Sequence, residues 1–132
     1  MSLLFDRAVG LFNESARAYR VDPNSEVQVD IAAILLQQSV ETAIDNVFID
    51  LNKNPKGADC NIIQKFKNMG MFYGDSGWYI ELSEHIHQIG SWEFSSMGLY
   101  HAKRSQYKEI FPIVGKFLQY LTDCQKEPST DK

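Results

Sequence analysis

The sequence predicts an all-α protein, an up-down bundle of four main helices plus one short helix. Apolar residues recur at three- and four-residue steps through four segments of the 132-residue chain, which is the period of amphipathic helices. No stretch has the alternating pattern of a strand hairpin. A chain of this length can bury roughly two-thirds of its unfolded surface, so we expect a single domain over residues 1–124 and a flexible polar tail over 125–132.

The first two helices are predicted from apolar stripes and from the break between them. The first runs from Ser2 or Leu3 to Tyr19, and Pro23 ends the segment because proline disfavours helical geometry in the residue before it. Ser25 is the predicted N-cap of a long second helix that reaches Leu51, since a serine hydroxyl can accept from the free N–H groups of a first helical turn.

The second half of the chain is more interrupted. We predict a short helix over 60–68 capped by Asp59, a glycine-rich loop that folds back over the core, and a helix over 78–89. The last helix is predicted over 99–124. Pro112 lies inside it, and a proline there costs ~3 kcal/mol, so we expect a kink or a break into two helices.

Composition limits the function. The chain has 17 acidic and 13 basic residues, a net charge of −4, which disfavours broad nucleic-acid binding but leaves room for a local basic patch. It shows neither an N-terminal signal sequence nor an apolar run of about 18 residues, so we expect no membrane association. Cys60 and Cys124 lie far apart and outside any metal-ligand spacing. They favour free thiols in a reducing cytoplasm, and we expect no cofactor.

The strongest lead is a polar notch in the long helix. Gln37 and Glu41 lie at the margin of its apolar stripe, and Asp45 follows one turn later. We expect Gln37 and Glu41 to face partner helices, where a carboxylate needs a compensating donor. Lys103 or Arg104 is the expected donor by chain order. The alternative is an ordinary helix margin in contact with water.

A second candidate is the chain's main concentration of positive charge, in which aromatic residues alternate with basic ones. Such a patch can contact a phosphate and stack on a base. The alternative is a solvated helix start with one tyrosine in the core. Its members are Tyr100, His101, Lys103, Arg104, Tyr107 and Lys108.

A weaker candidate is a metal site. Glu84 and His87 have the Glu-x-x-His spacing used by carboxylate di-iron bundles, with Glu81 nearby and Glu41 as a further ligand from the long helix. The alternative is a solvated helix face, with His85 packed at its edge. No nucleophile motif such as Gly-x-Ser-x-Gly is present.

Residues 35–43, LLQQSVETA, resemble the signature helix of HEPN domains, in which Gln-Gln-x-Val/Ala-Glu lies between apolar residues. HEPN domains are small all-helical bundles, and the first and last predicted helices also fit their pattern. The resemblance implies a module that binds a nucleotide, RNA or a partner protein such as a nucleotidyltransferase.

The chain departs from the family's ribonucleases, which carry an arginine shortly before a histidine near the start of the last helix. His101 has a suitable place, but Phe94, Ser95 and Ser96 stand where the arginine belongs, and Arg104 follows the histidine. Losing that cation removes a stabiliser of the transition state. We therefore expect a non-catalytic member, with a metal-independent, toxin-like ribonuclease using His101 and Arg104 as the alternative. We also expect a homodimer, because small bundles commonly cover a wide apolar helix in a symmetric contact.

Overall fold

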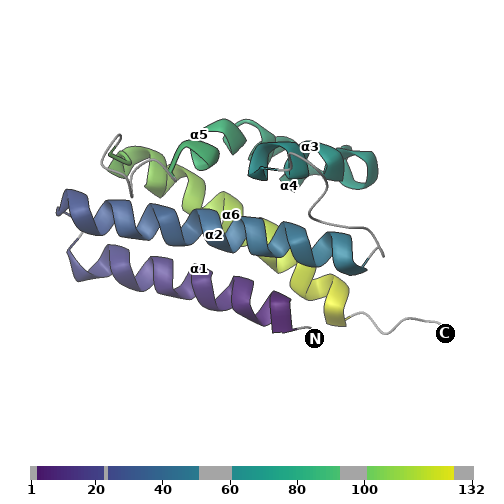
Figure 1. Ribbon diagram of the computed structural model, residues 1–132, viewed down its shortest axis with the longest axis horizontal. Coiled ribbons are helices and arrows are strands. Elements are labelled where there is room, and N and C mark those ends of the chain that lie inside the picture. Colours follow the sequence, from purple (N-terminus) through teal and green to yellow (C-terminus); the bar gives the residue numbers. More distant parts are fainter. Residues whose placement is uncertain (1–2, 23, 51–60, 93–100, 127–132) are drawn as a thin grey trace.

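The computed structural model describes residues 3–22, 24–50, 61–92 and 101–126, and within these ranges the chain forms six α-helices and no strand. Three helices are long and three are short, so the predicted count of four main helices and one short helix is wrong while the all-α class is confirmed. Figure 1 shows the long helices below and the short ones as a layer across them.

Helices α1 (Leu3–Val21) and α2 (Glu26–Asp50) lie antiparallel, side by side (Figure 1). Small residues let them approach closely: the Ser39 hydroxyl donates to the Ala8 carbonyl at 2.7 Å, and the Ser15 hydroxyl donates to the Ala32 carbonyl at 2.6 Å. The predicted cap of α2 is confirmed, since the Ser25 hydroxyl accepts from the Gln28 N–H at 3.3 Å.

Helix α6 (Arg104–Lys126) passes behind this pair and supplies Tyr107, Val114 and Phe117 to the core. It begins five residues after the predicted start at Leu99 and extends two residues beyond Cys124. The helix continues through Pro112, so the predicted break does not occur. Proline is tolerated there because residue 112 is exposed, where water can satisfy the carbonyl that loses its N–H partner.

Helices α3 (Ile62–Tyr73), α4 (Gly77–Ser83) and α5 (Ile86–Ser91) form the covering layer. Helix α3 is capped by the Asn61 side chain, which accepts from the Gln64 N–H at 2.9 Å, rather than by Asp59, which lies outside the described residues. It also continues through the predicted loop at Gly70. A Cβ there would lie 2.8 Å from the Tyr79 hydroxyl, so glycine allows that ring to pack against the helix.

The helix predicted over 78–89 is two helices, α4 and α5, separated at Glu84 and His85. Leu82, Ile86 and Ile89 are all buried, as the helical spacing indicated, but the chain turns between the first and second of them. No described helix is long and apolar enough to cross a bilayer.

Candidate functional site

Gln37 is buried in the middle of α2 and faces the short helices, as the helical pattern predicted. Its Nε2 donates to the backbone carbonyls of Ile89 at 3.2 Å and Gly90 at 3.3 Å. Two carbonyl acceptors identify the nitrogen end of this amide, so the oxygen end is directed elsewhere. Among the described residues, no donor contacts Oε1.

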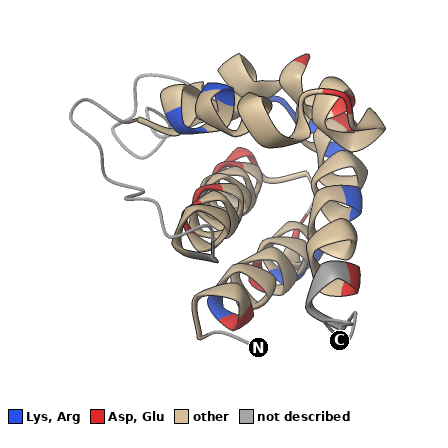
Figure 2. Cartoon of the chain, turned by 90° about the vertical axis from the view of Figure 1, so that its right-hand side faces the viewer, with Lys and Arg blue, Asp and Glu red and all other residues tan. Residues whose placement is uncertain are grey.

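Glu41, one turn further along α2, also faces the short helices, but its compensating donor was predicted wrongly. Lys103 and Arg104 do not supply it. The ammonium of Lys65, from α3, lies 3.1 Å from Glu41 Oε2 and 3.0 Å from Asp45 Oδ1. In Figure 2 the acidic side of α2 is turned towards the layer of short helices. Two carboxylates around one ammonium leave this cluster with a net negative charge.

Lys65 stays charged in this position. Burial lowers the pKa of its ammonium, but the hydrogen bonds and charges of Asp45 and Glu41 raise it, and the net result is a pKa above the ordinary lysine value. The Lys65 side chain is only 7% exposed, whereas that of Glu41 is 38% exposed. The lysine is therefore the buried support and the glutamate is the group that solvent or a ligand can reach.

A cleft of about 350 Å³ opens beside this cluster, between α2, the start of α3, and α5. The described part of its wall carries a carboxylate, two side-chain amides, an imidazole, a hydroxyl and two isoleucines, and no lysine or arginine. The lining residues are Gln37, Glu41, Asn61, Ile62, Ile63, His87, Gly90 and Ser91. Gly90 contributes to its shape, since a Cβ at that position would lie 3.1 Å from Ile63 Cδ1. This is the cleft that we consider the candidate site.

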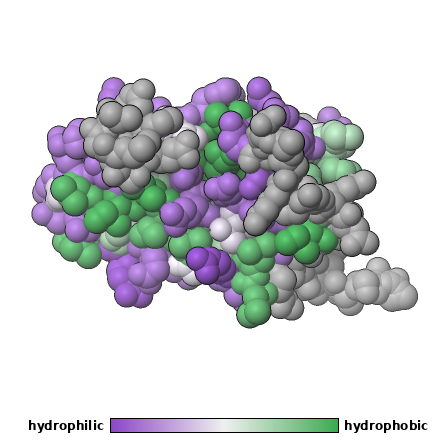
Figure 3. All heavy atoms as spheres, viewed as in Figure 1, coloured by the Kyte–Doolittle hydropathy of each residue, from purple (hydrophilic) through white to green (hydrophobic). Residues whose placement is uncertain are grey.

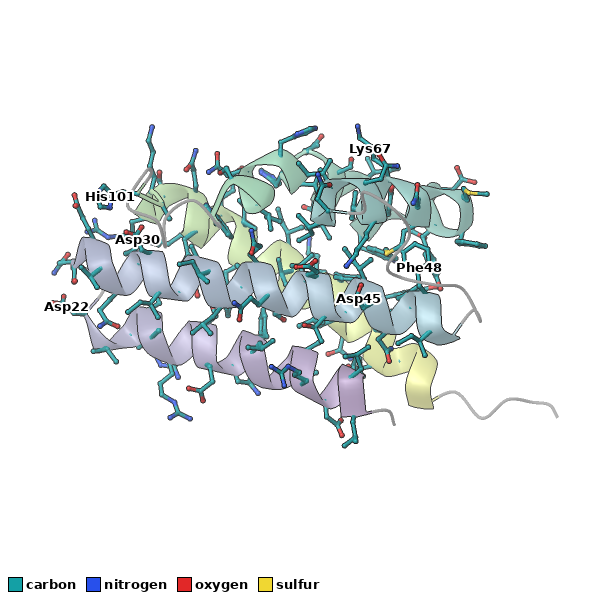
Figure 4. All side chains as sticks on the ribbon, in the orientation of Figure 1. Asp22, Asp30, Asp45, Phe48, Lys67 and His101 are labelled. Atoms are coloured by element: carbon teal, nitrogen blue, oxygen red, sulfur yellow. The ribbon has the colours of Figure 1, made fainter. Side chains whose placement is uncertain are left out.

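The basic cluster predicted near the start of the last helix is brought together only in part. His101 Nδ1 lies 2.9 Å from Asp30 Oδ2, and Asp30 Oδ1 accepts from the Ala102 N–H at 2.7 Å. Figure 4 shows His101 and Asp30 together at one end of α2, with Asp45 towards the other. The hydrogen bond and charge of Asp30, with the charge of Glu26, raise the pKa of the His101 imidazole.

Tyr107 belongs to the core, as the alternative interpretation held, and its hydroxyl lies 2.7 Å from the Ser15 hydroxyl. Lys103 and Arg104 line a shallow cavity together with His101. The acidic side chain of Glu26 lines the same cavity. Tyr100 lies outside the described residues. Tyr107 therefore does not line the cavity that holds His101, Lys103 and Arg104, although it lines another with Lys108.

The metal ligands suggested by sequence spacing are not brought together. Glu81 is paired with Lys116 at 3.0 Å, and Glu41 is paired with Lys65. His87 lines the candidate cleft, whereas Glu84 is exposed on the turn between α4 and α5. Within the described part of the chain, no three His, Cys, Asp or Glu side chains are placed to hold one ion.

Three residues that hold the site or the fold together were not predicted from the sequence. No local pattern singles out Lys65, because only its contacts with α2 make it a buried residue. Asp30 holds the segment before α6 from 72 positions away, a separation that no local pattern reveals. Asn61 was also missed as a cap, although an Asn before an apolar run is a recognised start signal.

No family model, curated protein or solved structure matches this chain.

Proposed function

We propose that this chain is a non-catalytic, HEPN-like binding module. Its cleft between α2, α3 and α5 takes a cationic, hydrogen-bond-donating group of a partner protein. One observation carries the proposal: Glu41 presents a partly open carboxylate whose position is fixed by a buried lysine. Lys65 holds one oxygen of this carboxylate, and 38% of the Glu41 side chain remains exposed, so a ligand can still reach it.

The charge of the cleft favours a cation over a phosphate. Glu41 lines it, Asp45 adds a second negative charge behind Glu41, and Lys65 neutralises only one of the two. A nucleotide or RNA phosphate would meet the Glu41 carboxylate there, and the described residues of the wall include no lysine or arginine to hold it. A guanidinium or ammonium would meet a carboxylate. Of the partners that the HEPN resemblance implies, a protein therefore fits this cleft best.

The free hydrogen-bond acceptors of the cleft also favour a cationic, donating group. Among the described residues, no donor bonds to Gln37 Oε1 or to Glu41 Oε1, so both oxygens can accept a hydrogen bond from a ligand. A planar arginine head has five N–H donors and can satisfy two acceptors at once. Ile62 and Ile63 can pack against its aliphatic part.

The test uses benzamidine as a guanidinium-like probe and benzoate as its anionic counterpart. Titration followed by NMR of the Gln37 and Asn61 side-chain amides should show saturable shifts with benzamidine and none with benzoate. Glu41→Gln should weaken benzamidine binding about tenfold or more, which corresponds to about 1.4 kcal/mol. Glu84→Gln removes the same charge at an exposed position and should bind like wild type.

Stability must be measured on the same variants. The Glu41→Leu variant should unfold at a temperature similar to that of the wild type, since packing can replace a partly buried charge. It should nevertheless no longer bind benzamidine. If both Glu41 variants retain the probe, the cleft is not its site and the proposal fails. Equal shifts with benzoate would also contradict it, because charge would then play no part.

The ribonuclease alternative can be tested separately. It needs His101, Arg104 and neighbouring cations around one phosphate, whereas His101 is paired with Asp30 and Tyr107 with Ser15. We expect no cleavage of single-stranded or structured RNA by the wild-type protein. Cleavage that disappears in His101→Ala would reinstate the enzyme.

A further inference from the structure

A second cleft, of about 210 Å³, lies on a different side of the protein, between α1 and α6. Three aromatic rings and two cations surround it, and none of the described residues that line it is acidic. The lining residues are Ala16, Tyr19, Arg20, Tyr107, Lys108 and Phe111. Its volume lies below the range of about 300–1,000 Å³ that accommodates drug-sized ligands, so it suits a small molecule of one or two fused rings.

The aromatic wall is held in place by contacts that do not involve a ligand. The rings of Tyr19 and Tyr107 stack with centroids 4.8 Å apart, and Tyr107 lies 5.6 Å from Phe111. Phe111 in turn stacks on Phe12 at 4.4 Å. The Tyr107 hydroxyl is bonded to Ser15, which fixes the depth of that ring. A preformed wall loses little side-chain entropy when a ligand binds.

The two cationic side chains at the rim of this cleft are free to bind an anion. Arg20 and Lys108 are exposed, and neither forms an ion pair with any residue in the described ranges. The positive charge of Arg20 already acts on Tyr107, where it partly opposes the rise that burial causes in the pKa of the phenol. In a chain of net charge −4, two unpaired cations beside aromatic rings are a local exception to the overall charge.

We propose that the α1–α6 cleft binds a small aromatic anion. The ring packs on Tyr19 and Phe111, and the acidic group meets Arg20 and Lys108. Ring stacking contributes a directional contact in addition to burial, and the guanidinium can bind a carboxylate or phosphate with two N–H groups. This site does not rest on the function proposed above, since it involves other helices and selects the opposite charge.

The experiment compares 2-naphthoate with 2-naphthamide, its neutral counterpart of the same shape, on the full chain. Shifts of the Tyr19 and Phe111 ring protons should saturate, with naphthoate bound at least fivefold more tightly than the amide. The double variant Arg20→Gln/Lys108→Gln should remove this preference. Arg17→Gln/Lys67→Gln removes the same two charge types from α1 and α3 and should retain it.

A third variant tests the cavity itself. Ala16→Leu places a larger side chain in the cleft without altering its charge. It should lower the affinity for both compounds about tenfold and leave the helical circular-dichroism signal unchanged. Equal affinity for acid and amide, a preference that persists in Arg20→Gln/Lys108→Gln, or an absence of saturable shifts at Tyr19 and Phe111 would each overturn the assignment.

Discussion

Lys65 connects α3 to two carboxylates of α2, and its substitution should be costly. Lys65→Met keeps the length of the side chain but leaves Glu41 and Asp45 facing each other without a cation. Breaking a buried pair costs about 3–5 kcal/mol, and the partial exposure of Glu41 reduces this to about 2 kcal/mol. Urea unfolding should show this loss. The matched change at an exposed lysine of the same helix, Lys67→Met, should alter the free energy of unfolding by less than about 0.5 kcal/mol.

The same lysine predicts a pH dependence. Its pKa is raised in the folded state, so its contribution is complete below the ordinary lysine value of about 10.4 and is lost as the pH rises through the folded value. Wild-type stability should therefore fall more steeply above about pH 10.4 than that of Lys65→Met. Parallel alkaline slopes in the two proteins would show that the ion pair does not contribute.

His101 gives a residue-scale prediction at the other end of α2. Its pKa is raised chiefly by Asp30, so the imidazolium should persist to higher pH than in a free histidine. Proton NMR titration should show this, and Asp30→Asn should return the value towards the ordinary one. Any stabilisation is present below the ordinary histidine pKa of about 6.5 and is lost as pH rises through the raised value.

These residues show where sequence reasoning succeeded in the site. Gln37 and Glu41 follow from helical periodicity, because their position on α2 relative to its apolar stripe depends on local geometry alone. Their partners do not: Lys65 is 24 positions from Glu41, and the backbone acceptors of Gln37 are 52 and 53 positions away. Chain order is a poor guide to such contacts, which is why Lys103 and Arg104 were wrongly expected to be the donors.

At the scale of elements, Ser15 joins three helices through one hydroxyl. It donates to the Ala32 carbonyl of α2 and contacts the Tyr107 hydroxyl of α6. Ser15→Ala leaves a buried phenol without its partner, at a cost of about 1–2 kcal/mol. Tyr107→Phe should cost about 1 kcal/mol. The double variant should lose less than the sum, because the second change removes the group that the first leaves unpaired. Additive thermal-unfolding data would contradict the coupling.

Helix α6 offers a stabilising change. Pro112 is exposed, and the helix is continuous around it, so the proline removes a backbone hydrogen bond with no packing role to offset the loss. Pro112→Ala should stabilise the protein by about 1 kcal/mol, which is below the full propensity difference because alanine also frees the unfolded chain. A lower melting temperature would show that a bend at Pro112 is required for packing.

The errors in element prediction have local causes. Gly70 favours a loop in the sequence, yet it lies within α3. The residue is glycine there because the Tyr79 ring occupies the space that a side chain would need. The separation of α4 from α5 was missed because Leu82, Ile86 and Ile89 keep helical spacing across the turn. In contrast, α1 and α2 were predicted well, since long periodic segments bounded by a proline and a serine cap leave few alternatives.

At the scale of the whole molecule, part of the apolar surface of α2 is not covered by the other described helices. Val27 is 63% exposed and Ile31 is 41% exposed, and Ile34 and Leu35 are half-buried next to them. Figure 3 shows a hydrophobic area over the first half of α2, on the face turned towards the viewer. Contiguous apolar surface of this kind commonly marks a contact with another protein.

We propose that a second copy of the chain covers this area, which corresponds to the homodimer expected from the sequence. In a two-fold contact the same surface is used twice, so Ile31 of one copy would lie near the same exposed apolar area of the other copy. A charge at this position would be placed twice in the interface. Ile31→Glu should therefore convert a dimer into a monomer in light scattering at micromolar concentration, with the helical content unchanged.

The control for this prediction is Ile80→Glu, which introduces the same charge at a similarly exposed isoleucine, 52% exposed, on α4. It lies in the layer of short helices, outside the proposed contact, and should leave the dimer intact. A wild-type monomer at these concentrations would contradict the homodimer directly. Dissociation by both variants would mean that added charge, rather than this face of α2, controls association, and the contact would have to be sought elsewhere.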